Sequence, residues 1–198
     1  MRDYIEFMWF RIVLPLFLFS ALACAQSKQA AAAPSVDNDF VHQQFGDTCN
    51  LEPQWAPLTG DLNGDGIPDL VMVARCKNPF IDADEKSFQI IDPMDSFFGY
   101  GNPRITSSMG QDDPKLKGIC VLVIHGAGND AWRSSTPQAK FVIINIAVKS
   151  IAVRKMKISK KKMTMAIYLE EATGDDMTSA LFWDGKKYRY APLGSSME

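Results

Sequence analysis

The sequence predicts a mainly β domain, a β-rich α+β fold built on an antiparallel sheet with one short N-terminal helix and a C-terminal hairpin. Two observations lead to this expectation. Apolar runs of strand length recur along the chain, whereas the apolar spacing of a long helix is missing. Near the C-terminus, Asp184-Gly185 separates two short aromatic-rich segments, and this dipeptide suits the positive φ angles of a tight hairpin turn.

The first 25 residues have the pattern of a signal peptide (residues 1–25) rather than of a folded segment. Ile12–Ala23 is uncharged and mainly apolar, and it is shorter than the roughly 20 helical residues that span a bilayer. Small residues follow at Ala23-Cys24-Ala25, so cleavage is expected before Gln26. Alternatively, Cys24 becomes a lipidated N-terminus, because Ala21–Cys24 resembles a bacterial lipobox. Both interpretations predict export, to a secreted or periplasmic location or as a membrane-anchored lipoprotein, with no transmembrane span in the mature chain.

Residues 26–35 lack apolar periodicity and are expected to form a flexible leader. A single β-rich domain is then expected over residues 36–198. At its start, Ser35 is expected to cap a short helix that ends at Gly46. The apolar residues of that helix recur at helical spacing and are Val36, Phe40, Val41 and Phe45.

Three apolar runs are expected to be strands, namely Ile67–Cys76, Ile119–His125 and Phe141–Val148. The last two are almost continuously apolar, which indicates central strands covered on both faces. Residues 163–170 alternate between apolar and polar, as in a strand with one buried face. Residues 92–118 are punctuated by proline and glycine and are expected to form long surface loops.

The net charge of −2 gives no whole-protein reason to expect nucleic acid or an anionic membrane as a partner. Three cysteines remain after cleavage at Ala25, and they are Cys49, Cys76 and Cys120. In an oxidising compartment one pair can form a disulfide, and the sequence allows all three pairings. Their spacings match no zinc pattern.

One segment carries the spacing of an oxygen-ligated cation loop. Side-chain oxygens of Asp61, Asn63, Asp65 and Asp69 stand at loop positions 1, 3, 5 and 9, and the Ile67 carbonyl stands at position 7. Calcium takes about six to eight oxygen ligands. Carboxylates this close repel one another unless a cation neutralises them, so the composition favours calcium.

The loop is not an EF-hand. An EF-hand places a bidentate glutamate at position 12, where this chain has Met72, and a strand rather than a helix is expected to follow. Gly64 and Gly66 allow the backbone to wrap around an ion.

Gly60–Leu70 instead resembles the FG-GAP/VCBS-type calcium loop of β-propeller proteins, including the blades of integrin α-subunits. There, a G-D-x-N-G-D-G-x-x-D-L stretch joins two strands. The resemblance implies a calcium ion held by Asp61, Asn63, Asp65, the Ile67 carbonyl and Asp69. A complete propeller is not expected, because the loop occurs once. Trp183–Tyr188 also resembles the W-D-G-K-x-Y ending of bacterial secreted proteins that carry such a loop.

Val121–Trp132 resembles the strand and oxyanion turn of an α/β-hydrolase. That mechanism needs a G-x-S-x-G nucleophile elbow and a late catalytic histidine. The chain has no G-x-S-x-G, and no histidine follows His125. Neighbouring acids such as Asp112 and Asp113 do not establish the separation that a glycosidase requires. We therefore assign no catalytic residue.

Two further segments leave alternatives open. Lys149–Lys162 contains seven basic residues and no acidic one. It forms either a solvated hairpin, with Lys160–Lys162 near the turn, or a contact with an anionic surface such as lipid headgroups or polysaccharide. Phe97, Phe98 and Tyr100 either contact a sugar or protein or pack back as a small core of their own loop.

These observations favour an exported calcium-binding β domain that acts as a non-enzymatic binding or interaction module with a structural ion. The expected partner is an unidentified protein or carbohydrate, and no organic cofactor is expected. Two alternatives stay open, a secreted hydrolase with carboxylates in its loops and a structural envelope protein.

Overall fold

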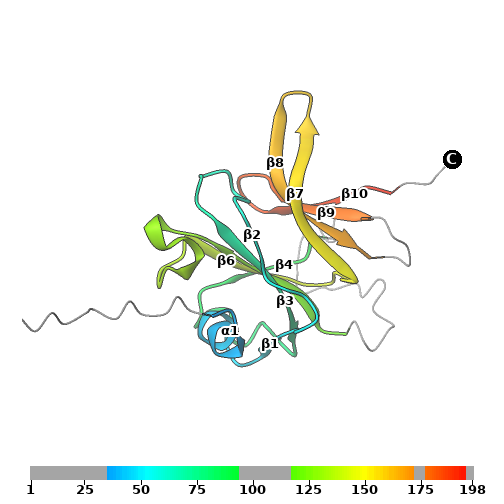
Figure 1. Ribbon diagram of the computed structural model, residues 1–198. Coiled ribbons are helices and arrows are strands. Elements are labelled where there is room, and N and C mark those ends of the chain that lie inside the picture. Colours follow the sequence, from blue (N-terminus) through cyan, green and yellow to red (C-terminus); the bar gives the residue numbers. More distant parts are fainter. Residues whose placement is uncertain (1–34, 94–116, 172–176, 195–198) are drawn as a thin grey trace, which may run out of the picture. The chain divides into compact units, whose positions relative to one another are not determined.

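A computed structural model describes residues 35–93, 117–171 and 177–194 (Figure 1). The predicted signal peptide and almost all of the leader lie outside the described residues, as do Phe97, Phe98 and Tyr100. All of the elements described below belong to one compact unit, residues 33–198.

Helix α1 spans Asn38–Phe45 and is capped at both ends. The Asp37 carboxylate accepts a hydrogen bond from the Phe40 N–H at 2.9 Å, and Gly46 ends the helix with a φ angle of 87°. The expected cap at Ser35 is therefore wrong, since Ser35 donates its hydroxyl to Asp37 instead. The short polar side chain that caps best is the one directly before the helix.

The first sheet contains six strands: β1 (Cys49–Leu51), β2 (Leu58–Gly60), β3 (Asp69–Cys76), β4 (Gln89–Ile91), β5 (Ile119–His125) and β6 (Ala139–Ile143). Their order is β1-β3-β5-β6-β4, and β2 also pairs with β3. The pairs are antiparallel except for β4 with β6, which run parallel. A short 3-10 helix, η1 (Gly128–Arg133), follows β5.

The second sheet is an antiparallel meander of β7 (Ser150–Ser159), β8 (Lys162–Glu170), β9 (Ser179–Trp183) and β10 (Tyr188–Pro192), in the order β10-β9-β8-β7. The C-terminal hairpin is present as expected. Its turn covers the four residues Asp184–Lys187, closed by a hydrogen bond from the Asp184 N–H to the Lys187 carbonyl. Gly185 supplies the positive φ angle, 105°.

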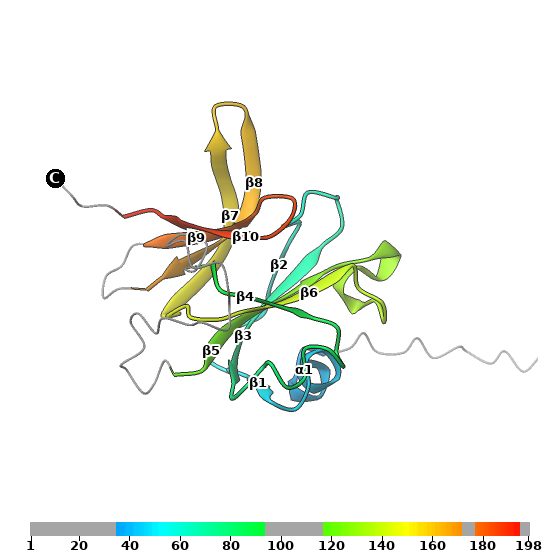
Figure 2. The ribbon, with the colours of Figure 1, turned by 180° about the vertical axis from the view of Figure 1, so that it is seen from behind.

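The first sheet separates two hydrophobic cores, because side chains alternate across β3 and β5. On one face, Leu70 and Met72 of β3 pack with the apolar face of α1. On the other face, Val71 and Val73 pack with residues of the second sheet, including Ile167. Figures 1 and 2 show α1 on one side of the first sheet and the second sheet on the other. Burial of β3 and β5 on both faces explains their nearly continuous apolar sequences.

The fold class is confirmed, since the described residues form a mainly β structure without a closed barrel or propeller. The expected strand Ile119–His125 is observed with the same bounds. The strand expected over Phe141–Val148 ends at Ile143. Asn145 has a φ angle of 58°, which interrupts the ladder, although Ile146 and Val148 are still buried.

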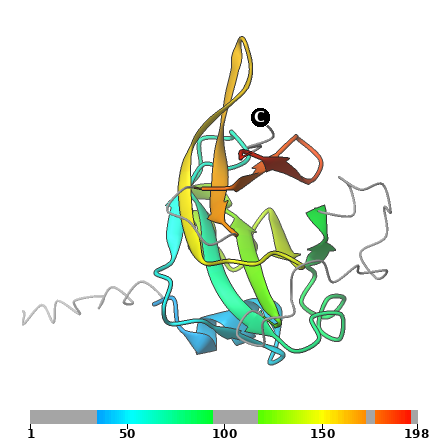
Figure 3. The same ribbon diagram turned by 90° about the vertical axis from the view of Figure 1, so that its right-hand side faces the viewer.

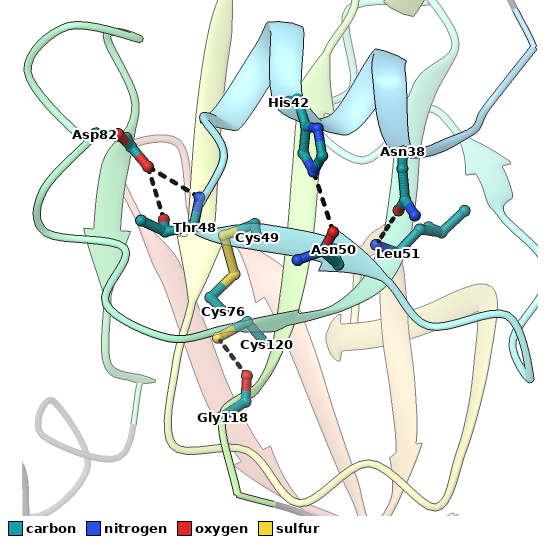
Figure 4. The surroundings of a disulfide bond; sticks show 10 residues. All are labelled: Asn38, His42, Thr48, Cys49, Asn50, Leu51, Cys76, Asp82, Gly118 and Cys120. Carbon is teal, nitrogen blue, oxygen red and sulfur yellow. Dashed lines mark hydrogen bonds between the residues drawn. A yellow bond between two sulfur atoms is a disulfide. The ribbon is translucent and has the colours of Figure 1, made fainter.

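The disulfide joins Cys49 to Cys76, one of the three pairings that the sequence allows. These residues face each other across β1 and β3. Figure 4 shows two more hydrogen bonds that hold β1 and the residue before it. The Leu51 N–H donates to the Asn38 side-chain oxygen, and the Thr48 hydroxyl donates to the Asp82 carboxylate. Cys120 remains a buried thiol, and burial raises its pKa to about 12.

Candidate metal centre

The acidic loop, Asp61–Asp69, connects β2 to β3, and its two ends lie next to each other. Gly60 pairs with Asp69 in the antiparallel ladder of these two strands. Gly64 and Gly66 have φ angles of 81° and 84°. Because only glycine adopts such angles without strain, these two positions let the chain close a tight loop over so few residues.

Asp61 organises the first half of the loop through its carboxylate. Its Oδ1 accepts hydrogen bonds from the N–H groups of Gly64 at 2.8 Å and Asp65 at 3.1 Å. Its Oδ2 accepts one from the Gly66 N–H at 3.0 Å. The side chain is half-buried, and the loop backbone winds around it.

Asp65 is exposed at the outer side of the loop. Its Oδ1 accepts from the Ile67 N–H at 2.7 Å. Its Oδ2 accepts from the amides of Asn63 at 2.9 Å and Gln138 at 2.7 Å. Burial alone would raise the pKa of Asp65, but these hydrogen bonds hold it below its usual value.

Asp69 is fully buried at the start of β3. Its Oδ2 accepts from the Leu62 N–H at 2.7 Å and the Asn63 N–H at 3.3 Å. Its Oδ1 accepts from the Gly126 N–H at 2.9 Å, which links the loop to the end of β5. Burial raises the pKa of Asp69 to about 6, although the three N–H groups oppose that shift.

Each of the three aspartates keeps one oxygen that accepts a single hydrogen bond within the described part of the chain. These oxygens are Asp61 Oδ2, Asp65 Oδ1 and Asp69 Oδ1. A carboxylate oxygen has about two acceptor sites, so each can still bind a cation. The Asn63 side-chain oxygen also accepts one bond, from the Asp65 N–H at 3.1 Å.

The carboxylates nevertheless do not form a cage by themselves. Among the described residues, no three His, Cys, Asp or Glu side chains converge to hold a metal ion. Each carboxylate accepts hydrogen bonds from backbone N–H groups of the loop, and Asp65 and Asp69 also accept from Gln138 and Gly126 outside it. The donor types, their order and the backbone path suit calcium, and a bound ion would require the carboxylates to draw together.

The end of β5 packs directly against the acidic loop. A Cβ atom at Gly126 would lie 2.5 Å from the Pro68 carbonyl oxygen, so only glycine allows this approach. The expected strand Ile119–His125 is followed here by a glycine-containing turn that leads into η1. The turn supplies an N–H to Asp69, and that contact is a structural one.

His125 is 2% exposed, and its Nε2 lies 2.7 Å from the Tyr188 hydroxyl. The rings of Phe141 and Trp183 lie 5.0 Å from its own ring, centroid to centroid. Burial lowers the pKa of His125 to about 4, against the attraction of Asp65 and Asp61. The imidazole is therefore neutral near pH 7 and hydrogen-bonds to a phenol.

Sequence reasoning identified the loop but missed its neighbours. Gln138, Gly126 and Tyr188 come from segments distant in sequence and are brought to the loop by the pairing and packing of β5, β6 and β10. The glycine after the apolar strand at residues 119–125 was a local signal for a close approach. Nothing in the local sequence distinguishes Gln138, and the W-D-G-K-x-Y pattern that contains Tyr188 does not indicate its contact with His125.

A shallow pocket of about 260 Å³ lies between the acidic loop and the hairpin of β7 and β8. Its lining includes Asp61 and Gly64 on one side and Lys155, Met163 and Met165 on the other. Sites for drug-sized ligands usually measure about 300 to 1,000 Å³. The pocket is therefore small for a buried organic substrate.

The chain matches no protein-family model, and neither curated proteins nor solved structures give a significant match. The structure itself defines a mainly β domain in which an acidic loop connects β2 to β3. No helix in the described segments is long and apolar enough to cross a membrane.

Proposed function

We propose that this chain is an exported, non-enzymatic β binding module whose acidic loop holds a structural calcium ion. The ligands would be Asp61, Asn63, Asp65, the Ile67 carbonyl and Asp69. The observation that carries the proposal is the set of three aspartate oxygens with spare acceptor capacity in one tightly wound loop. A bound ion would neutralise carboxylates that otherwise repel one another and would strengthen the link between β2, β3 and β5.

Export is supported by the apolar run and small-residue site at the N-terminus, and also by the disulfide. Disulfides persist in oxidising compartments and are rare in the cytosol. The bond between Cys49 and Cys76 closes a loop of 27 residues and fastens the three-residue strand β1 to the sheet. A chain that relies on this bond suits an extracytosolic environment.

A non-enzymatic role is supported by the partners of the acidic and imidazole groups. Asp69 binds backbone N–H groups, Asp82 binds Thr48, and His125 hydrogen-bonds to Tyr188. These contacts hold segments of the fold together. A hydrolase would need such carboxylates and imidazoles to be exposed to its substrate, whereas here they bind other parts of the fold.

Calorimetric titration with calcium tests the ion. Residues 26–198 contain the whole compact unit of residues 33–198, and we expect one calcium ion per chain with a rise in melting temperature. Asp65→Ala should weaken binding at least tenfold, because it removes one carboxylate ligand. Asp84→Ala removes an exposed carboxylate elsewhere and should bind calcium like the wild type. Absence of both heat and thermal shift at millimolar calcium would overturn the proposal.

A further inference from the structure

The hairpin of β7 and β8 extends beyond the rest of the compact unit (Figures 1 and 3). Its base is packed, since a Cβ atom at Gly60 of β2 would lie 2.8 Å from a Val153 methyl group. Ile167 and Leu169 of β8 are buried in the same core. Towards the turn the residues become exposed, from Arg154 on β7 to Met163 on β8. We call residues 154–163 the hairpin tip.

The hairpin tip concentrates positive charge. Its exposed basic residues are Arg154, Lys155, Lys157, Lys160, Lys161 and Lys162. Within the described ranges, none of them forms an ion pair within 4.0 Å of an acidic group. Outside residues 149–162, by contrast, 23 acidic residues outnumber 14 basic ones. Residues 149–162 are thus a basic segment in a chain whose other residues are acidic on balance, although the net charge is only −2.

Apolar side chains lie among these lysines. Met163 is 56% exposed and faces Lys157 across the two strands. The register shifts between Lys157 and Ser159, which leaves the half-exposed Ile158 at a bulge next to the turn. Methionine is flexible and polarisable, and it adapts to irregular apolar surroundings. The hairpin tip therefore combines a cationic rim with apolar side chains at its end.

We propose that the hairpin tip binds the anionic surface of a lipid bilayer. The lysine ammonium groups would contact lipid phosphates and carboxylates, while Met163 and Ile158 enter the interfacial region. Charge complementarity selects an anionic partner. The exposed methionine favours lipid over an anionic polysaccharide, because a polysaccharide offers no apolar phase for it.

The place of the hairpin tip in the fold also determines the orientation of the bound molecule. An anionic surface attracts the hairpin tip, which extends beyond the rest of the compact unit (Figures 1 and 3). The acidic loop lies next to the hairpin, since Asp61 lines a pocket with Lys155 and Met163, and stays on the same side of the molecule. The molecule would therefore bind with the hairpin directed at the membrane and α1 on the opposite side of the compact unit. This partner deepens the binding-module part of the proposed function and does not involve calcium.

Vesicle co-sedimentation tests the proposal with residues 26–198 in EDTA at low ionic strength. We expect binding to vesicles that mix phosphatidylcholine with phosphatidylglycerol and little binding to phosphatidylcholine alone. A variant with Lys160→Gln, Lys161→Gln and Lys162→Gln should bind about a hundredfold more weakly, since each lysine near an anionic surface contributes about fivefold. The three side chains are exposed, so the melting temperature should stay close to that of the wild type.

A matched control removes the same charge elsewhere, through Lys77→Gln, Lys117→Gln and Lys186→Gln, which are all exposed lysines. It should bind far more tightly than the hairpin variant. Met163→Ser should weaken vesicle binding several-fold and leave binding to dextran sulfate unchanged. Equal losses in the two lysine variants would overturn the proposal. So would tight binding to dextran sulfate combined with no effect of Met163→Ser on vesicles, which would indicate a polysaccharide partner.

Because the assay contains EDTA, its result is separate from the calcium titration. Vesicle binding without calcium binding would contradict only the metal part of the proposed function. Calcium binding without selective vesicle binding would contradict only the membrane surface.

Discussion

Asp69 connects three parts of the molecule through a single buried carboxylate. It begins β3, accepts from the N–H groups of Leu62 and Asn63 in the acidic loop, and accepts from Gly126 after β5. A buried N–H group without an acceptor destabilises the folded state. The residue therefore has a structural role that does not depend on any bound ion.

This role predicts the effect of Asp69→Ala in EDTA. The substitution leaves the buried Leu62 and Gly126 N–H groups without this acceptor, so we expect the free energy of unfolding to fall by at least about 2 kcal/mol. Urea denaturation measures the change. Asp84→Ala, at an exposed position, should alter the free energy of unfolding by less than about 0.5 kcal/mol. Equal stabilities of the two variants would refute a structural role for Asp69.

His125 predicts a pH dependence of stability that Asp69 opposes. Burial lowers the pKa of His125 from 6.5 to about 4, so below pH 6.5 the unfolded chain takes up a proton that the folded chain excludes. The contribution of His125 to the free energy of unfolding therefore falls as the pH falls from 6.5 to 4. Burial raises the pKa of Asp69 from 3.8 to about 6, so the folded chain binds that proton first. The contribution of Asp69 to the free energy of unfolding rises as the pH falls through the same range.

His125→Phe removes the first effect and keeps the second. Relative to the wild type, the free energy of unfolding of this variant should increase by about 2 to 3 kcal/mol between pH 7 and pH 4. The Tyr188 hydroxyl loses its partner at every pH, so that loss is a constant offset. Urea denaturation in EDTA across this pH range gives the difference. A difference that stays constant with pH would show that His125 titrates normally in the folded state.

Strand β1 depends on its covalent link more than the longer strands do. It has three residues, and among the described strands its one partner is β3, with Cys49 opposite Cys76. Replacing Cys49 and Cys76 by alanine should lower the free energy of unfolding by about 3 kcal/mol, from loss of the constraint on the unfolded chain. Cys120→Ala removes the buried thiol and should have a smaller effect. If urea denaturation gave Cys120→Ala the larger loss, the disulfide would not be the main stabilising bond of this region.

Elements with strong local signals were predictable from the sequence. The apolar run Ile119–His125 has the predicted bounds because it is buried on both faces, which leaves a continuous signal. The end of β6 was not predictable, because Ile146 and Val148 are buried without belonging to the strand. Burial alone does not distinguish a strand from a buried irregular segment. The parallel pairing of β4 with β6 depends on contacts between distant segments, which local patterns do not encode.

The acidic loop was predictable for a similar reason, since its ligand spacing and glycines lie within eleven consecutive residues. Its surroundings were not. The contact between Asp65 and Gln138 spans 73 residues, and the contact between Asp69 and Gly126 spans 57. Such contacts depend on the register of the sheet, which follows from the whole fold.

On the scale of the whole molecule, the first sheet joins the two hydrophobic cores. Trp132 packs against Phe40 in the core beside α1, with ring centroids 5.7 Å apart. Trp183 packs beside the core between the two sheets. Strands β3 and β5 contribute side chains to both cores, so loss of either core exposes one face of both strands. We therefore expect the two cores to unfold together.

Single-tryptophan variants test this cooperativity. The variants are made in residues 26–198, which lack Trp9. Trp55→Phe with Trp183→Phe leaves Trp132 to report on the helix side, and Trp55→Phe with Trp132→Phe leaves Trp183 to report on the second sheet. The two fluorescence transitions in urea should coincide. Ile167→Ala creates a cavity in the core between the sheets. It should lower the free energy of unfolding obtained from each of the two transitions by the same amount, roughly 2 to 4 kcal/mol. If it displaced only the Trp183 transition, the second sheet would unfold independently of the first, and the shared strands would not couple the two cores.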